Sequence, residues 1–307
     1  MLNAVRPFVR SARKIVAKSK LRGLPGNGFP QSVLPAATYL VSEKADDMAE
    51  KIADRIEAER DRLASFGSQK VDILYSPKPG SAGSTATADL RPSHGEVMQF
   101  SMEQVARTGK TRRWGLFMHL LAREHRSANI LELGTCAGIS GSYIGSSPHC
   151  QQLRTIEGSP ALAELARSVL PLTVTNPTVI NALFDDALDE ILPDIEPIDF
   201  LFIDGHHEKI ATIHYWQRIR SKLSDGAVVV FDDISWSQDM RDGWNELVRE
   251  PYFSHAMDFG TVGVCIYHKD GSKPPRQWDL RAIAGVGKAV GNPHGWKNRE
   301  AAVALAD

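Results

Sequence analysis

Short apolar runs alternate with helical segments from residue 128 onward, and this alternation restricts the fold more than any other feature of the chain. The runs span residues 128–133, 152–157, 177–181, 198–204 and 227–232. They are apolar throughout rather than at every second position, as in parallel strands covered on both faces. The segment 209–223 between two of them carries an apolar stripe at helical spacing. The pattern predicts a doubly wound, mostly parallel α/β sheet.

Two further strand-like runs, residues 254–259 and 262–268, are separated only by Gly260 and Thr261. A connection of two residues joins antiparallel strands, because a parallel return needs a long crossover. We therefore expect the parallel sheet to end in an antiparallel hairpin, which is unusual for dinucleotide-dependent dehydrogenases.

The part of the chain before residue 96 is predicted to contain a helix, a loop and a basic N-terminal arm. Residues 43–66 have a helical apolar stripe, whereas residues 76–95 are rich in Pro, Gly, Ser and Thr and are typical of a loop. Residues 1–42 carry seven basic and no acidic side chains, so the remainder carries −8 within a total of −1. Residues 1–22 are amphipathic at helical spacing, which leaves a transit-like peptide, an anionic-membrane contact or a solvated extension open.

Composition excludes several classes of protein. The 307 residues are 42% hydrophobic and include no run of 18 apolar residues, so they can form a sizeable core and predict no spanning helix. The three cysteines form no Cys-x-x-Cys pair, which argues against structural zinc and fits a reducing compartment. We therefore expect a cytoplasmic protein, with membrane-peripheral or organelle-targeted location through the basic arm as the alternative.

A glycine-containing loop follows the first apolar run. Gly134 and Gly138 allow a tight strand-to-helix turn and a close approach of the backbone to a ligand. Glu157 ends the next run, where an acidic side chain accepts hydrogen bonds from ribose hydroxyls. The alternative is that both glycines serve only the turn, but the acid at the second strand end favours a ligand that contains a nucleoside.

Three aspartates end two later strands. Asp204 follows one run, and Asp232 and Asp233 end the next. Because parallel strands open at the same edge of a sheet, we expect the three carboxylates to converge there. An all-oxygen set suits a hard divalent cation, with Mg²⁺ first and Mn²⁺ or Ca²⁺ as alternatives. The competing interpretation of Asp232 and Asp233 is a helix N-cap pair.

A histidine lies three residues beyond Asp204. A histidine titrates near neutral pH, so His207 is a candidate general base for a hydroxyl proton, with His206 and Lys209 as weaker substitutes. The alternative is a surface or capping histidine.

The pattern Glu-x-Gly-x-x-x-Gly after the first strand and Thr-Ile-Glu-Gly-Ser-Pro at the second resemble class I S-adenosylmethionine (SAM)-dependent methyltransferases. Within that class, residues 95–268 are most similar to the metal-dependent O-methyltransferases of the catechol, caffeoyl-CoA and macrolide-sugar type. The resemblance implies a Rossmann-like sheet of seven strands with an antiparallel edge hairpin, preceded here by an N-terminal helical extension.

The resemblance also assigns site residues. It implies that the methionine part of SAM is held by Glu132, Gly134, Thr135, Gly138 and Ser140, with Ser140 on its carboxylate. Glu157 would hold the ribose, and Asn181 and Ala182 would lie near the adenine. Asp204 would bind either the metal or the amino group of the cofactor. A divalent ion on Asp204, Asp232 and Asp233 would assist His207 in activating the acceptor hydroxyl.

The resulting prediction is a SAM-dependent O-methyltransferase acting on a small hydroxylated molecule. The predicted divisions are a basic arm and linker (1–42), a helical extension and loop (43–95), the SAM-binding domain (96–270) and a C-terminal tail (271–307). We also expect a homodimer as one option for assembly, a weak anionic-membrane contact through residues 1–22 and no specific nucleic-acid binding.

Three alternatives differ in class. A metal-independent methyltransferase would use the same cofactor residues. A dehydrogenase-type enzyme is disfavoured by the absence of Gly-x-Gly-x-x-Gly, by Glu132 and by the carboxylates. A non-catalytic protein of the same fold would instead act through its basic arm on a membrane or a nucleic acid.

Overall fold

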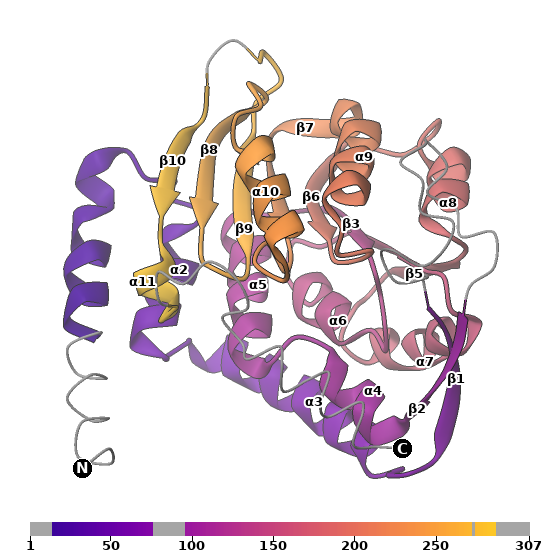
Figure 1. The fold of residues 1–307 in the computed structure, drawn as a ribbon. Helices are drawn as coiled ribbons and strands as arrows, with labels where there is room; N and C mark the ends of the chain where they lie inside the picture. Colours follow the sequence, from indigo (N-terminus) through magenta and orange to yellow (C-terminus); the bar gives the residue numbers. More distant parts are fainter. Residues whose placement is uncertain (1–13, 76–95, 272–273, 287–307) are drawn as a thin grey trace.

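The computed structural model describes residues 14–75, 96–271 and 274–286, and its centre is a mostly parallel sheet of eight strands (Figure 1). The spatial order is β10-β8-β9-β7-β6-β3-β4-β5. The strands are β3 (Asn129–Leu133), β4 (Gln152–Glu157), β5 (Pro177–Asn181), β6 (Ile198–Ile203), β7 (Leu223–Phe231), β8 (Phe253–Asp258), β9 (Gly263–Tyr267) and β10 (Arg276–Asp279). Strands β5, β4, β3, β6 and β7 are mutually parallel, and β9 is antiparallel to both β7 and β8.

The predicted doubly wound sheet and its antiparallel hairpin are confirmed, but the predicted number of strands is wrong. Strand β10 adds an eighth member, parallel to β8, from residues expected to form a tail. The hairpin β8–β9 therefore lies inside the sheet, and β10 forms the edge. Trp278 of β10 packs edge-on against Phe29, with ring centroids 5.1 Å apart, so the N-terminal segment helps to hold this strand.

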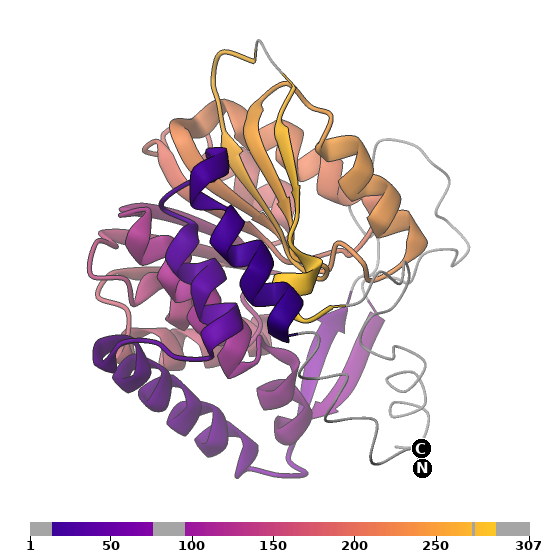
Figure 2. The ribbon, with the colours of Figure 1, turned by 90° about the vertical axis from the view of Figure 1, so that its left-hand side faces the viewer.

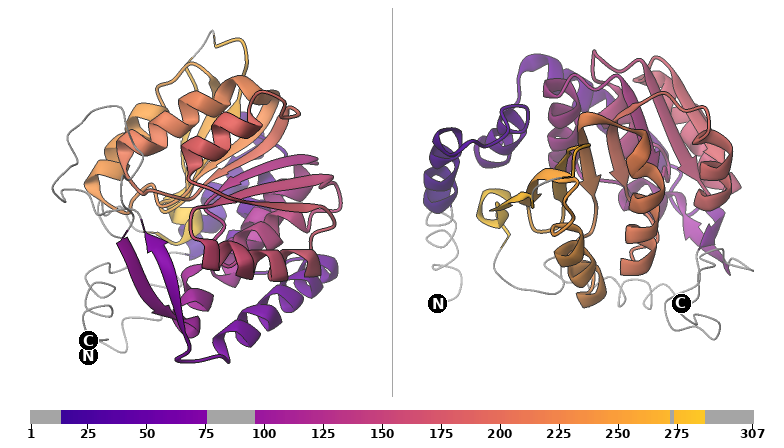
Figure 3. Two further views of the ribbon diagram at one scale, coloured as in Figure 1. Left: turned by 90° about the vertical axis from the view of Figure 1, so that its right-hand side faces the viewer. Right: turned by 90° about the horizontal axis from the view of Figure 1, so that it is seen from above.

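Helices cover both faces of the sheet (Figure 3). One apolar cluster joins alternate strand residues such as Ile130 and Phe202 to α5 (Arg112–Glu124), α6 (Ile139–Gly145) and α7 (Pro160–Val169). The other joins residues such as Leu131 and Phe231 to α8 (Phe184–Ile191), α9 (Lys209–Ile219) and α10 (Gln238–Leu247). Two apolar faces on each strand explain why the runs lack alternation.

The N-terminal part adds a helical layer outside α5 and α6. Residues 14–23 are helical, and α2 (Leu34–Ser42) and α3 (Asp47–Ala64) follow (Figure 2). The predicted helix over residues 43–66 is thus confirmed as α3, which begins where the Asp46 carboxylate accepts hydrogen bonds from the N–H groups of Met48 and Ala49. Residues 1–13 of the basic arm lie outside the described residues. No helix in the described ranges is long and apolar enough to cross a membrane.

A second, small sheet was not predicted. Strands β1 (Lys70–Tyr75) and β2 (Glu96–Ser101) pair antiparallel, and the predicted loop of residues 76–95 between them lies outside the described residues. Helix α4 (Met102–Thr108) follows β2 through a capping box between Ser101 and Gln104. The remaining elements are the short helix α11 (Arg281–Ala284) and the 3₁₀ turns η1 (Pro25–Asn27), η2 (Leu170–Leu172) and η3 (Arg220–Lys222).

The strand register gathers the predicted site residues at one edge of the sheet. Leu133 of β3 pairs with Ile156 of β4 and with Ile203 of β6, and Ile203 pairs in turn with Phe231 of β7. The residues that follow these four positions include Gly134, Glu157, Asp204 and Asp232. The parallel register therefore places the carboxyl ends of four strands together, which is where ligands bind in open α/β sheets.

Candidate active site

The loop after β3 requires glycine for reasons of backbone packing. Gly134 has a φ of 98°, and a Cβ atom there would lie 1.9 Å from the carbonyl oxygen of Asp204. Gly138 has a φ of 82° and forms the N-cap of α6. Any side chain at position 134 would push apart the ends of β3 and β6. The tight-turn interpretation of these glycines is thus supported, and a ligand contact stays a prediction.

A buried polar network lies beneath this loop. Glu132 has no exposed surface, and its two carboxyl oxygens accept hydrogen bonds from Ser140 Oγ at 2.6 Å and from Thr155 Oγ1 at 2.6 Å. Thr135 Oγ1 lies 2.5 Å from Thr155 Oγ1. Burial raises the pKa of Glu132 to about 8, against the lowering effect of both hydroxyls. These hydrogen bonds link the loop and the start of α6 to strands β3 and β4. The predicted contact of Ser140 with a carboxylate ligand remains a prediction.

Glu157 joins the loop to the end of β4. Its carboxylate accepts hydrogen bonds from the N–H groups of Cys136 at 2.8 Å and Ser159 at 2.9 Å, while burial raises its pKa. Asn181 Nδ2 donates to the Glu157 carbonyl oxygen at 2.8 Å, which brings the end of β5 alongside, and Ala182 there is half-buried. The residues predicted for the ribose and the adenine are therefore neighbours.

Asp204, His207 and Asp233 form a cluster in which one donor atom from each lies within 4.8 Å of the others. His207 Nδ1 is 3.8 Å from Asp233 Oδ2, and the His207 ring stacks on Trp236 with centroids 5.1 Å apart. Both His207 (φ 28°) and Asp233 (φ 49°) adopt left-handed backbone conformations. Such strain persists only where surrounding contacts enforce it, and it is concentrated at functional sites.

Asp232 occupies a different environment from the other two aspartates. Its side chain is fully buried and forms an ion pair with Lys110, whose ammonium also lies 4.0 Å from Asp204 Oδ2. Burial raises the pKa of Asp204, and the nearby Lys110 opposes this rise. The two carboxylates of the cluster are oxygen donors of the kind that a hard divalent cation prefers, whereas an imidazole is more typical of transition-metal sites. Asp232, as placed, faces an ammonium instead, so the predicted set of three aspartates does not meet as one cluster.

Sequence reasoning missed Lys110. The residue lies between α4 and α5, far along the chain from the aspartates and in no motif, so only the tertiary structure places it at the strand ends.

Arg241 of α10 is a second missed residue. Its buried guanidinium donates to Asp258 Oδ2 at 2.7 Å and to the Gly260 carbonyl oxygen at 3.0 Å, and it also contacts Ser235 Oγ. Arg241 therefore ties the loop after Asp233 to the turn of the hairpin. Charge-assisted bonds of this kind fix loop geometry.

The two weaker candidates for a base are engaged elsewhere. His206 Nδ1 lies 2.7 Å from the Tyr215 hydroxyl, and burial lowers the pKa of this histidine. Lys209 Nζ pairs with Glu246 at 2.8 Å. His207 is consequently the candidate base that lies within the carboxylate cluster.

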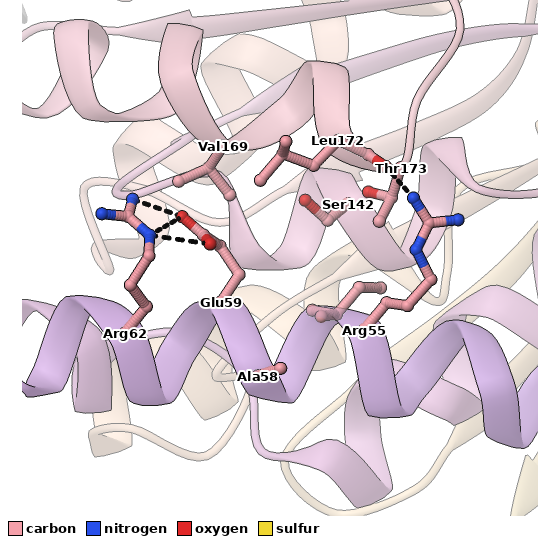
Figure 4. Close-up of a pocket in the computed structure, with 9 residues that line it drawn as sticks. Arg55, Ala58, Glu59, Arg62, Ser142, Val169, Leu172 and Thr173 are labelled. Atoms are coloured by element: carbon pink, nitrogen blue, oxygen red, sulfur yellow. Dashed lines mark hydrogen bonds and ion pairs between the residues drawn. The ribbon is translucent and has the colours of Figure 1, made fainter.

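A pocket of about 420 Å³ lies between α3 and the α6–α7 region (Figure 4). Arg62 and Arg55 of α3 face it, and they pair with Glu59 at 2.8 Å and with the Leu172 carbonyl oxygen at 2.5 Å, respectively. Its lining shares no residue with the predicted site. Because its charged groups already pair with one another or with backbone, we assign the chemistry to the strand ends.

Comparison with known families identifies the central region. Residues 131–234 match the family model of a methyltransferase domain. The match runs from β3 through the pair Asp232–Asp233 and includes Gly134 and Glu157. This region is therefore similar to a methyltransferase domain, in agreement with the resemblance that the sequence motifs indicate. No curated protein sequence matches the chain.

Several solved structures resemble the fold. An O-methyltransferase from Bacillus cereus in complex with SAH is 23% identical, covers 53% of this chain and 84% of its own, and gives a TM-score of 0.48. An O-methyltransferase of tomaymycin synthesis from Streptomyces achromogenes, in complex with SAM, is 23% identical over 52% and 82% of the two chains, with a TM-score of 0.46. An SAH-bound methyltransferase from Podospora anserina is 18% identical over 54% and 82%, with a TM-score of 0.46.

Proposed function

We propose that the methyltransferase domain of this chain transfers a methyl group from SAM to a hydroxyl group of a small molecule. The observation that carries the proposal is one juxtaposition inside the matched domain. The loop of Gly134, the acid Glu157 and the cluster of Asp204, His207 and Asp233 share the carboxyl edge of the sheet. The acid at the second strand end therefore lies at the same edge as groups able to handle a hydroxyl proton, and this arrangement supports the proposal.

Glu157 has hydrogen-bonding capacity that the ribose of SAM would use. Its carboxylate accepts hydrogen bonds from the backbone N–H groups of Cys136 and Ser159, and that of Gly158 also acts on it, whereas an ionised carboxylate has about four lone-pair sites in total. The remaining lone pairs are those that a ribose diol would use. The half-buried Gly134 and Cys136 leave the loop backbone within reach of the same ligand.

The chemistry needs little more than alignment and one proton acceptor. The acceptor oxygen attacks the methyl carbon in line, the carbon–sulfur bond breaks, and the sulfonium leaves as a neutral thioether. The hydroxyl proton passes to His207. The Oδ2 atom of Asp233 lies 3.8 Å from His207 Nδ1, so the carboxylate is the nearest partner for the ring that has taken up the proton.

Divalent-cation assistance is part of the proposal. Asp204 and Asp233 would hold the ion while His207 remains free to accept the hydroxyl proton, and Asp232 would join them only when its ion pair with Lys110 is broken. A bound cation would lower the pKa of an acceptor hydroxyl. Metal-independent transfer is the second candidate, which the ion pair between Lys110 and Asp232 favours. The acceptor, a homodimer, a membrane contact through residues 1–22 and the lack of nucleic-acid binding stay predictions.

Calorimetric titration of the full chain with SAM, and separately with NAD, tests the cofactor assignment. We expect SAM to bind, and Glu157→Ala to weaken this binding by about tenfold or more, because a charged hydrogen-bond acceptor is lost. The exposed Glu164→Ala on α7 is the matched control and should bind SAM as the wild type does. Binding of NAD rather than SAM would favour the dehydrogenase alternative.

A further inference from the structure

Lys110 reaches the site from outside the matched methyltransferase domain. Its ammonium pairs with the fully buried carboxylate of Asp232 and lies 4.0 Å from Asp204 Oδ2. Only 17% of the Lys110 side chain is exposed. A cation from the N-terminal part of the chain therefore stands between the carboxyl ends of β6 and β7.

The loop that carries Lys110 is held in place by α3. Arg60 donates to the carbonyl oxygens of Ala106 at 2.8 Å, of Gly109 at 3.5 Å and of Lys110 itself. Its guanidinium also pairs with Glu57 at 2.9 Å. Three backbone contacts from one guanidinium fix the loop, so Lys110 occupies a built position rather than a freely moving one.

The charges explain what the ammonium does there. A carboxylate as buried as that of Asp232 needs a partner of opposite charge in the fold, and Lys110 supplies it. A divalent ion bound to Asp204 would lie close to the Lys110 ammonium, which is 4.0 Å from Asp204 Oδ2. Two positive charges that close repel each other strongly in a partly buried site. Lys110 and a divalent ion thus compete for one set of carboxylates.

We propose that Lys110 is the resident cation of this cluster. It engages Asp232 and Asp204 and weakens the binding of divalent cations there. For catalysis this inference deepens the metal-independent candidate of the proposed function and rests on it, whereas the competition with metal ions rests only on the contacts above. Lys110 acts here as a positioning residue, through the two aspartates.

Titration of chelator-treated full chain with MnCl₂, followed by electron paramagnetic resonance, tests the competition. Lys110→Met should bind Mn²⁺ about tenfold or more tightly than the wild type, since the repelling charge is gone. Lys110→Arg retains the charge and should bind as weakly as the wild type. Lys51→Met, at an exposed position of α3, is the control for loss of a lysine. Equal Mn²⁺ affinity of Lys110→Met and the wild type would overturn the proposal.

Loss of Lys110 leaves Asp232 buried without its counter-charge, so a second variant guards against misfolding. Lys110→Met combined with Asp232→Asn removes both charges, while Asp204, His207 and Asp233 remain. This variant should still bind Mn²⁺ more tightly than the wild type, and failure to do so would count against the proposal.

The same proteins separate this inference from the proposed function. Mn²⁺ titration needs neither SAM nor an acceptor, so a chain that fails to bind SAM refutes methyl transfer without touching the competition. Conversely, a wild-type protein that binds SAM but also binds Mn²⁺ as tightly as Lys110→Met does would refute only the role of Lys110.

Discussion

Replacing Glu132 by glutamine should change how the free energy of unfolding depends on pH. Glu132 has no exposed surface, and burial raises its pKa to about 8 from an ordinary value of 4.5. The folded protein therefore keeps a proton that the unfolded chain releases between these two values. The contribution of Glu132 to the free energy of unfolding is therefore greatest below about pH 4.5 and is lost as the pH rises from there through 8. Glutamine cannot ionise, so the variant lacks this loss.

The size of the effect follows from linkage. Each pH unit within the window is worth about 1.4 kcal/mol, so the wild type should lose about 2 kcal/mol between pH 6 and pH 8 through Glu132 alone. Urea unfolding at both pH values measures this loss, and the comparison of wild type with Glu132→Gln isolates it. Glutamine retains the hydrogen bonds, because Ser140 still donates to its carbonyl oxygen and Thr155 can accept from its amide.

Other titrations must be separated from this one. Burial lowers the pKa of His119 to about 4, which raises stability as the pH increases from 4 to 6.5, the opposite sign. This contribution is present in both proteins and cancels in the difference. Glu164→Gln, at an exposed position, should reproduce the wild-type profile. If Glu132→Gln lost as much stability as the wild type between pH 6 and pH 8, the reasoning about the buried carboxyl would be refuted.

Two further substitutions test the loop and the base. Gly134→Ala should destabilise the protein by about 3 kcal/mol and weaken SAM binding, because a Cβ would lie 1.9 Å from the Asp204 carbonyl oxygen. Urea unfolding measures this loss. The control Gly26→Ala should show no such loss, because no atom lies within 4 Å of a Cβ at that position. His207→Gln should lower kcat by about 10²–10⁴-fold while leaving the Kd for SAM unchanged. An unchanged kcat in steady-state assays, as expected for the control His149→Gln, would remove His207 as the base.

The sheet was predictable because its signal is local. The apolar runs 128–133 and 177–181 became β3 and β5, and the two-residue connection after residue 259 became the turn of the hairpin β8–β9. Strand β10 has only four residues, with Arg276 and Asp279 at its ends, so neither length nor hydrophobic pattern reveals it. Its pairing depends on β8 and on the packing of Trp278 against Phe29.

The site was predictable only as far as chain order determines it. Asp204 and Asp233 follow neighbouring parallel strands, so their proximity follows from topology, and His207 accompanies them within one loop. The separation of Asp232 from that cluster has another origin. It depends on Lys110, whose loop is placed by the contacts of Arg60 in α3, and no spacing in the sequence encodes such a contact.

Transfer of an isotopically labelled methyl group from SAM to a panel of sugars and vicinal diols, followed by NMR of the products, tests the central claim most directly. The account predicts that the wild-type protein places the label on an oxygen atom and that His207→Gln does so far more slowly. Label on nitrogen or carbon, or no transfer to any member of the panel by a protein that binds SAM, would contradict it.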